Sequence, residues 1–195
     1  MAKRKQSKAT KAKEAIEAVD FEVAQTVAPL RDKPSVKVIG VLSEVGDQPQ
    51  MRVIFAGVIG AGLLRRDRKL VRAGVRMLAA HSLATWAKTL IKNQVDRTRP
   101  KFLKEEDAGG LKRGHSHDKE QSSFPSGHTA GALAAVGTFA VDYPQYALPA
   151  WGAGAAVSAA QVPRCMHYPS DVGAGAVIGL ASAAVVNRFL PATAG

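Results

Sequence analysis

The sequence lacks several features that identify common classes of protein. Its 195 residues include one cysteine, Cys165, which excludes a fold held together by disulfide bonds within the chain. No internal repeat recurs, and no stretch alternates apolar and polar residues as a half-buried β-strand does. The basic first 13 residues are followed by an acidic, amphipathic stretch rather than the apolar core of a secretory signal. We therefore expect an all-α chain of one domain.

Acidic residues are also scarce. The chain has 16 Asp and Glu against 27 Lys and Arg, a formal net charge of +11. Such an excess favours anionic partners, namely phosphorylated substrates, acidic lipid surfaces or nucleic acid. No recognition helix and no interleaving of aromatic with basic residues supports the last of these. We expect a phosphorylated or membrane partner and no nucleic acid.

The N-terminal quarter predicts one or two amphipathic helices. Residues 1–13 are expected to form a basic flexible tail, with contact to acidic lipid headgroups as the alternative. Over residues 14–50, apolar side chains recur at helical spacing, first at Ile16, Val19, Val23, Val27 and Leu30. Pro34 is expected to end this helix, and a shorter helix should follow it before the turn-like residues 46–50.

Residues 51–190 alternate between apolar runs and charged segments, which predicts about five core helices. The runs cover residues 53–64, 70–91, 124–141, 143–163 and 172–187. Only residues 143–163 clearly exceed the roughly 18 residues that indicate a membrane span, so a soluble helical bundle is the alternative. The runs are apolar nearly all round rather than striped, and they are rich in small residues. This pattern favours a multipass membrane bundle.

Three polar motifs lie at the ends of these runs. The first, KNQVDRTRP, places Lys92 seven residues before Arg99, which precedes a proline. The second is Pro-Ser-Gly-His at 125–128, directly before an apolar run. The third is HYPSD, in which His167 and Asp171 are four residues apart. Up-and-down packing of the helices would bring all three motifs to one end of the bundle.

Together the motifs resemble the three-part signature of the type 2 phosphatidate phosphatase superfamily, which also includes the vanadium haloperoxidases. That pattern is a Lys, six residues and Arg-Pro; then Pro-Ser-Gly-His; then Ser-Arg, five residues, His, three residues and Asp. The resemblance runs from about residue 50 to residue 188 and includes the placement of the motifs among apolar helices. It implies that His167 is a nucleophile, Asp171 its partner and His128 a general acid.

The chemistry of the residues supports the same roles. Lys92 and Arg99 are cations suited to phosphoryl oxygens. Ser126 and Gly127 would open a helix whose free N–H groups bind an anion. His128 at that position would protonate the departing alcohol, and attack by His167 would form a phosphohistidine. Such a site needs no metal and no cofactor.

The chain departs from the superfamily pattern at one place. Ala160 and Gln161 stand where the pattern has Ser-Arg, so one cationic phosphate ligand is missing. Gln161 can donate a hydrogen bond but carries no charge. Arg164 follows three residues later and is the candidate replacement. The substitution predicts weakened or narrowed activity.

These features predict a membrane-embedded, metal-independent phosphatase that hydrolyses a lipid phosphomonoester or pyrophosphate, such as phosphatidate, phosphatidylglycerophosphate or a prenyl phosphate. The main alternative is a weakened or inactive relative that acts as a phosphate- or lipid-binding membrane scaffold, and the lesser one is a vanadate-dependent haloperoxidase-like enzyme. We expect a bacterial-type plasma membrane. Most Lys and Arg lie on the motif side, which favours a cytoplasmic active site. The sequence predicts no particular oligomeric state.

Overall fold

The computed structural model describes residues 8–103, 109–116 and 118–192, and helices dominate it. The α-helices are α1 (Lys8–Val27), α2 (Pro34–Ser43), α3 (Gln48–Arg65), α4 (Arg68–Lys92), α5 (Gly127–Asp142), α6 (Ala147–Ala159) and α7 (Pro169–Phe189). Short 3-10 turns are η1 (Ala28–Leu30), η2 (Glu44–Gly46), η3 (Pro100–Phe102), η4 (Lys119–Gln121) and η5 (Pro144–Tyr146). The all-α prediction is confirmed; the described residues add only strands β1 (Val95–Asp96) and β2 (Lys112–Arg113), paired antiparallel.

The N-terminal helices differ in their limits from the prediction. α1 already begins at Lys8, inside the segment expected to be a flexible tail, because Lys and Ala are good helix formers and no helix breaker precedes residue 14. Pro34 does not end the first helix, which stops at Val27; it begins α2. Proline fits the first helical turn because the N–H that it lacks would have no partner there.

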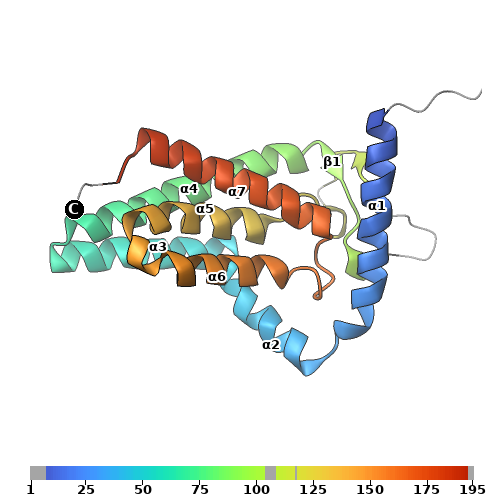
Figure 1. The fold of residues 1–195 in the computed structure, drawn as a ribbon, viewed down its shortest axis with the longest axis horizontal. Coiled ribbons are helices and arrows are strands. Elements are labelled where there is room, and N and C mark those ends of the chain that lie inside the picture. The colour runs from blue at the N-terminus through green and yellow to red at the C-terminus, as the bar shows by residue number, and fades with distance from the viewer. Residues whose placement is uncertain (1–7, 104–108, 117, 193–195) are drawn as a thin grey trace, which may run out of the picture.

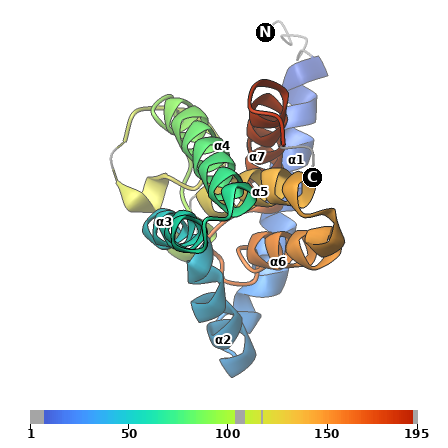
Figure 2. The same cartoon turned by 90° about the vertical axis from the view of Figure 1, so that its left-hand side faces the viewer.

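Helices α3 to α7 form a bundle with α5 at its centre. α5 contacts α4, α6 and α7 along its length, and α3 packs on α4. Viewed along the bundle in Figure 2, α3, α4, α6 and α7 surround α5. α1 lies across one end of the bundle, and α2 runs obliquely from it to α3 (Figure 1). The C-terminal end of α4 and the N-terminal ends of α5 and α7 lie together beside α1.

Small residues allow α5 to occupy the centre. Its buried positions are mostly Ala, Gly and Thr, which let neighbouring backbones approach closely. A Cβ atom at Gly179 of α7 would lie 2.5 Å from the carbonyl oxygen of Ala130, and one at Gly175 would lie 2.6 Å from that of Ser126. The close contact of α5 and α7 therefore depends on glycine at these positions.

The outer surface of the bundle carries many large apolar side chains. Leu64, Leu148 and Val177 are exposed by 88%, 84% and 68%, and such an extensive apolar exterior is typical of a surface that contacts other apolar matter. By length and composition, one helix among the described residues is suited to cross a membrane, and it is α7. The apolar run at 143–163 does not form one long helix, because a 3-10 turn takes its first residues and α6 stops at Ala159, after 13 residues.

The α5–α7 contact predicts different effects for two glycines of α7. Gly179→Ala should lower the free energy of unfolding by about 1–3 kcal/mol, because the added methyl group meets backbone atoms of α5. Gly173→Ala is the matched control, since no atom lies within 4 Å of its added Cβ and alanine favours the helix. Thermal unfolding in detergent measures both; equal melting temperatures would contradict this packing.

Candidate active site

A small cavity lies at the end of the bundle that α1 covers. Its volume is about 100 Å³, enough for a few water-sized groups. The residues that line it are Asp47, Gln48, Lys88, Lys92, Arg99, Gly127, His128 and His167. Residues from all three sequence motifs thus meet around one cavity.

Lys92 and Arg99 place positive charge on one side of the cavity. The Lys92 ammonium group, at the end of α4, donates a hydrogen bond to the carbonyl oxygen of Ser122. The Nε of Arg99 is buried and has no hydrogen-bond partner within the described structure. Burial lowers the pKa of Arg99, but a guanidinium remains charged at any physiological pH. Arg99 therefore has donor capacity left for an anion.

The start of α5 forms the opposite wall. Ser126 is the N-cap residue, and its hydroxyl accepts hydrogen bonds from the backbone N–H of Thr129 (3.4 Å) and from the Thr129 hydroxyl (3.1 Å). The Ser126 side chain is fully buried and does not line the cavity, unlike Gly127. Of these two predicted phosphate ligands, only Gly127 reaches the cavity, and the Ser126 hydroxyl instead caps the helix.

Two acidic residues that the sequence analysis missed lie beside His128. Ligand-type atoms of Glu44, Asp47 and His128 all lie within 4.8 Å of one another. Glu44 also forms an ion pair with Arg164, so it is not free to bind a cation by itself. Asp47 lines the cavity. It lies within the turn-like residues 46–50 at the start of α3, where nothing in the local sequence indicates proximity to a histidine 81 positions later.

His167 lies in the loop before α7 and is almost completely buried. Its backbone N–H donates to the carbonyl oxygen of Gln161 (3.3 Å). Its Nδ1 is 3.7 Å from Oδ2 of Asp171, too far for a hydrogen bond but close enough for a strong electrostatic interaction. Burial lowers the pKa of His167 to about 4, although Asp171 acts in the opposite direction. Burial therefore favours the neutral imidazole, which is the form that a nucleophilic histidine requires.

Asp171 is held by donors on both of its oxygens. Oδ1 accepts from Nη1 of Arg97 (2.7 Å). Oδ2 accepts from the Ser123 hydroxyl (2.5 Å) and from the backbone N–H of Tyr168 (2.9 Å). The carboxylate is fully buried, so these donors replace its hydration and fix its orientation towards His167.

Arg97 connects this carboxylate to the N-terminal helix. Its Nη2 donates to Oδ2 of Asp20 on α1 (2.8 Å), and its Nε donates to the carbonyl oxygen of Gly109 (2.9 Å). The guanidinium also lies 3.9 Å from the centre of the Tyr168 ring. Interaction with Asp171 and Asp20 raises the pKa of Arg97 against the effect of burial. Arg97 was not predicted from the sequence, although it lies within the first motif.

Comparison with known proteins assigns the chain to a family. The model of the PAP2 superfamily matches residues 73–193, which is more than half of the chain. The chain belongs to the PAP2 superfamily. No curated protein sequence matches it.

Two solved structures share the PAP2 fold of this chain. One is the transmembrane PAP2-type phosphatidylglycerolphosphate phosphatase from Bacillus subtilis, with a TM-score of 0.68, 21% identity, and coverage of 90% of this chain and 86% of that one. The other is LpxE from Aquifex aeolicus, with a TM-score of 0.64, 17% identity, and coverage of 86% and 94%. The resemblance of the motifs to the type 2 phosphatidate phosphatase superfamily is thus confirmed.

Gln161, at which the chain departs from the PAP2 pattern, does not supply a phosphate ligand to the cavity. Gln161 is fully buried, and its Nε2 donates to the carbonyl oxygen of Val157 (2.9 Å). Arg164 does not line the cavity either: it donates to the Ser43 hydroxyl (2.6 Å) and pairs with Glu44. The expected replacement of the missing arginine by Arg164 is therefore not seen in the arrangement of this structure.

The buried ion cluster predicts a large loss of stability when its cation is removed. Arg97→Gln should lower the free energy of unfolding by about 3–5 kcal/mol, because Asp20 and Asp171 would remain buried without their shared partner. Arg113→Gln is the control. It replaces an exposed arginine in the same connection between α4 and α5 and should have little effect on the free energy of unfolding. Thermal unfolding tests this, and equal melting temperatures for the two variants would refute it.

Proposed function

We propose that this PAP2 protein is a membrane-embedded phosphatase that hydrolyses a lipid phosphomonoester or pyrophosphate. The observation that carries the proposal is the meeting of Lys92, Arg99, the start of α5, His128 and His167 around one cavity. The apolar exterior of the bundle and the transmembrane phosphatase among its structural relatives support a membrane location and a lipid substrate. The cytoplasmic orientation of the active-site end stays a prediction.

In the proposed reaction, the phosphoryl group lies in the cavity between the cations and the N-terminus of α5. Nδ1 of His167 faces Asp171, so Nε2 is the atom that attacks phosphorus. The bond from phosphorus to the leaving oxygen breaks, and that oxygen takes a proton from His128. The oxygen of a water molecule then attacks phosphorus, and His128 accepts the proton of that water. The bond from Nε2 to phosphorus breaks, which releases inorganic phosphate and restores His167 and His128.

Asp171 and Asp47 would have complementary roles in this cycle. When His167 becomes phosphorylated, its ring carries positive charge, which the fixed carboxylate of Asp171 stabilises. Burial lowers the pKa of His128, and the neighbouring Asp47 acts in the opposite direction by favouring the protonated ring, which the first step requires. The cations of the site come from side chains, so we propose that the reaction needs no metal.

We propose that Lys88 supplies the charge that Gln161 lacks. Lys88 precedes Lys92 by four residues, one turn of α4, so both face the cavity. Its Nζ lies 3.0 Å from the place that a Cβ of Gly127 would occupy, directly at the start of α5. Arg164 is engaged by Glu44 and Ser43 instead. Lys88 is therefore the better-placed third cation.

The first test is phosphate release by the detergent-purified protein from a panel of lipid and soluble phosphomonoesters, with a chelator present. We expect release that prefers lipid substrates and falls by at least about 10³-fold in His167→Ala, because the nucleophile is lost. His115→Ala, an exposed histidine outside the cavity, is the matched control and should retain activity. No release above the His167→Ala background would favour the alternative, a phosphate-binding scaffold weakened at Gln161.

The second test concerns the third cation. Lys88→Gln should lower kcat/KM by about 10- to 100-fold, as expected when one charged donor to the transition state is removed. Adding Gln161→Arg should restore part of the loss, whereas Gln161→Arg alone should hold or raise activity. Lys37→Gln, an exposed lysine of α2, controls for the charge change. Equal activity of Lys88→Gln and Lys37→Gln would exclude the role of Lys88.

A further inference from the structure

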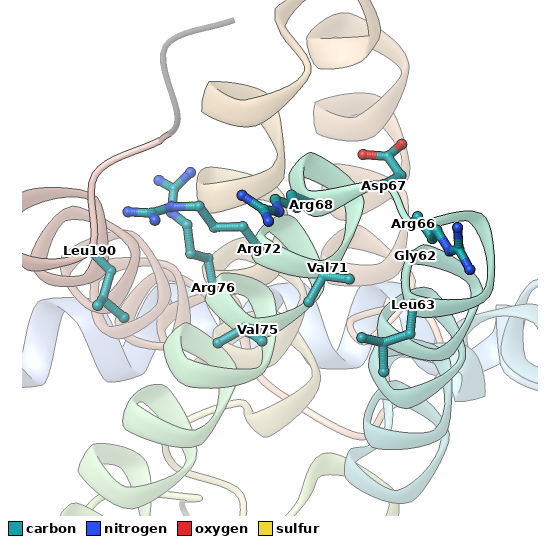
Figure 3. A pocket seen from close by; sticks show the side chains of 10 residues that line it. All are labelled: Gly62, Leu63, Arg66, Asp67, Arg68, Val71, Arg72, Val75, Arg76 and Leu190. Carbon is teal, nitrogen blue, oxygen red and sulfur yellow. The ribbon is translucent and has the colours of Figure 1, made fainter.

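A second and much larger cavity lies at the other end of the bundle. Its volume is about 750 Å³. It is formed by the turn between α3 and α4, the first turns of α4 and the segment that follows α7 (Figure 3). The residues that line it are Gly62, Leu63, Arg66, Asp67, Arg68, Val71, Arg72, Val75, Arg76 and Leu190. None of them belongs to the three sequence motifs or to the catalytic cavity.

Positive charge dominates this basic cavity. Four of the lining residues are arginines and one is acidic, Asp67. The carboxylate of Asp67 caps α4 by accepting from the backbone N–H of Leu70 (2.9 Å). Within the described residues, the guanidinium groups of Arg66 and Arg68 take part in no ion pair. The cavity therefore offers more positive charge than its own residues neutralise.

Arg76 adds a buried donor without a partner to the wall of the cavity. Its side chain is 1% exposed, and its terminal nitrogens donate to Asp142 on α5 and Asn187 on α7. Its Nε is buried without a hydrogen-bond partner among the described residues. Arg72 lies beside it in Figure 3 and donates to the carbonyl oxygen of Pro191 (3.0 Å from Nε). A buried donor without a partner is costly, and an oxygen of a bound anion would satisfy it.

The rest of the cavity is apolar. Leu63 is 64% exposed and Val75 is 44% exposed, and Val71 and Leu190 complete this side. A small anion such as free phosphate would make no use of these side chains. A lipid whose headgroup carries a phosphate matches both the basic and the apolar side of the cavity. Its phosphate would lie near the arginines and an acyl chain along Leu63, Val71 and Val75.

We infer that the basic cavity binds an anionic phospholipid as a bound lipid rather than as a substrate. Its phosphate diester would contact Arg68 and Nε of Arg76, and one acyl chain would cover the apolar wall. The inference rests on the membrane location in the proposed function but not on catalysis. Lipid binding here would tie together the ends of α3, α4 and α7, far from the phosphoryl chemistry.

The test is lipid binding by the purified protein in detergent, followed by native mass spectrometry. Phosphatidylglycerol is the probe, because its phosphate is a diester that the proposed phosphatase does not hydrolyse; phosphatidylcholine and inorganic phosphate are the comparison ligands. We expect phosphatidylglycerol to bind and phosphatidylcholine to bind at least about tenfold more weakly, since it adds a positive charge. Arg68→Gln should weaken phosphatidylglycerol binding by about tenfold.

Two matched variants make the result decisive. Arg65→Gln removes the same charge from the same end of the bundle, but Arg65 is exposed and does not line the cavity, so binding should be retained. Lys92→Gln alters the catalytic cavity and should also retain binding. Equal weakening in Arg65→Gln and Arg68→Gln, loss of binding in Lys92→Gln, or displacement by inorganic phosphate at similar concentrations would each overturn the inference. Failure of phosphate release alone would leave it intact.

Discussion

The arrangement of the catalytic end depends on one buried ion cluster, in which Arg97 lies between Asp171 and Asp20. A buried carboxylate is stable only when its oxygens are paired, and Asp171 receives Arg97, Ser123 and the backbone of Tyr168. The same guanidinium holds Asp20 of α1, whose carboxylate also accepts from the backbone N–H of Ser170 (3.0 Å). The start of α7, the connection after α4 and the N-terminal helix are therefore fixed by a single cation. The position of His167 relative to the cavity follows from this cluster.

This dependence explains why α1 contributes to the structure around the candidate active site although it carries no motif. Its helical spacing was visible in the sequence, and the apolar stripe that revealed it includes Ile16 and Val19. These two side chains are exposed by 52% and 57%, and the buried positions of the helix are Asp20 and Ala24. The side of α1 that packs on the bundle is thus the side that carries an acid. An aspartate in an amphipathic helix is ordinarily assigned to solvent, and only the distant Arg97 makes it a buried residue.

The sequence predicted what depends on local patterns. Helical spacing gave the all-α class, and the placement of three motifs at the ends of apolar runs predicted that they would meet, as they do around the catalytic cavity. It did not predict Asp47, Lys88 or Arg97, because their relevance arises from the packing of separate segments. It also misplaced the limits of the helices where proline decides them: Pro34 begins a helix instead of ending one, and a 3-10 turn at Pro144 shortens the apolar run that looked long enough to span a membrane.

Gln161 stands where the PAP2 pattern has arginine, so this chain lacks one positive charge there although the cavity is kept. The Gln161 side chain donates to the carbonyl oxygen of Val157 on α6, and the backbone carbonyl of Gln161 accepts from the N–H of His167. The nearby Arg164 is used structurally, since it ties that loop to Ser43 and Glu44 at the end of α2. A phosphoryl group needs positive charge around it but does not specify the helix from which that charge comes. α4 already places Lys92 at the cavity, and Lys88, one turn earlier, lines the same cavity. The proposed role of Lys88 therefore requires no change in the backbone.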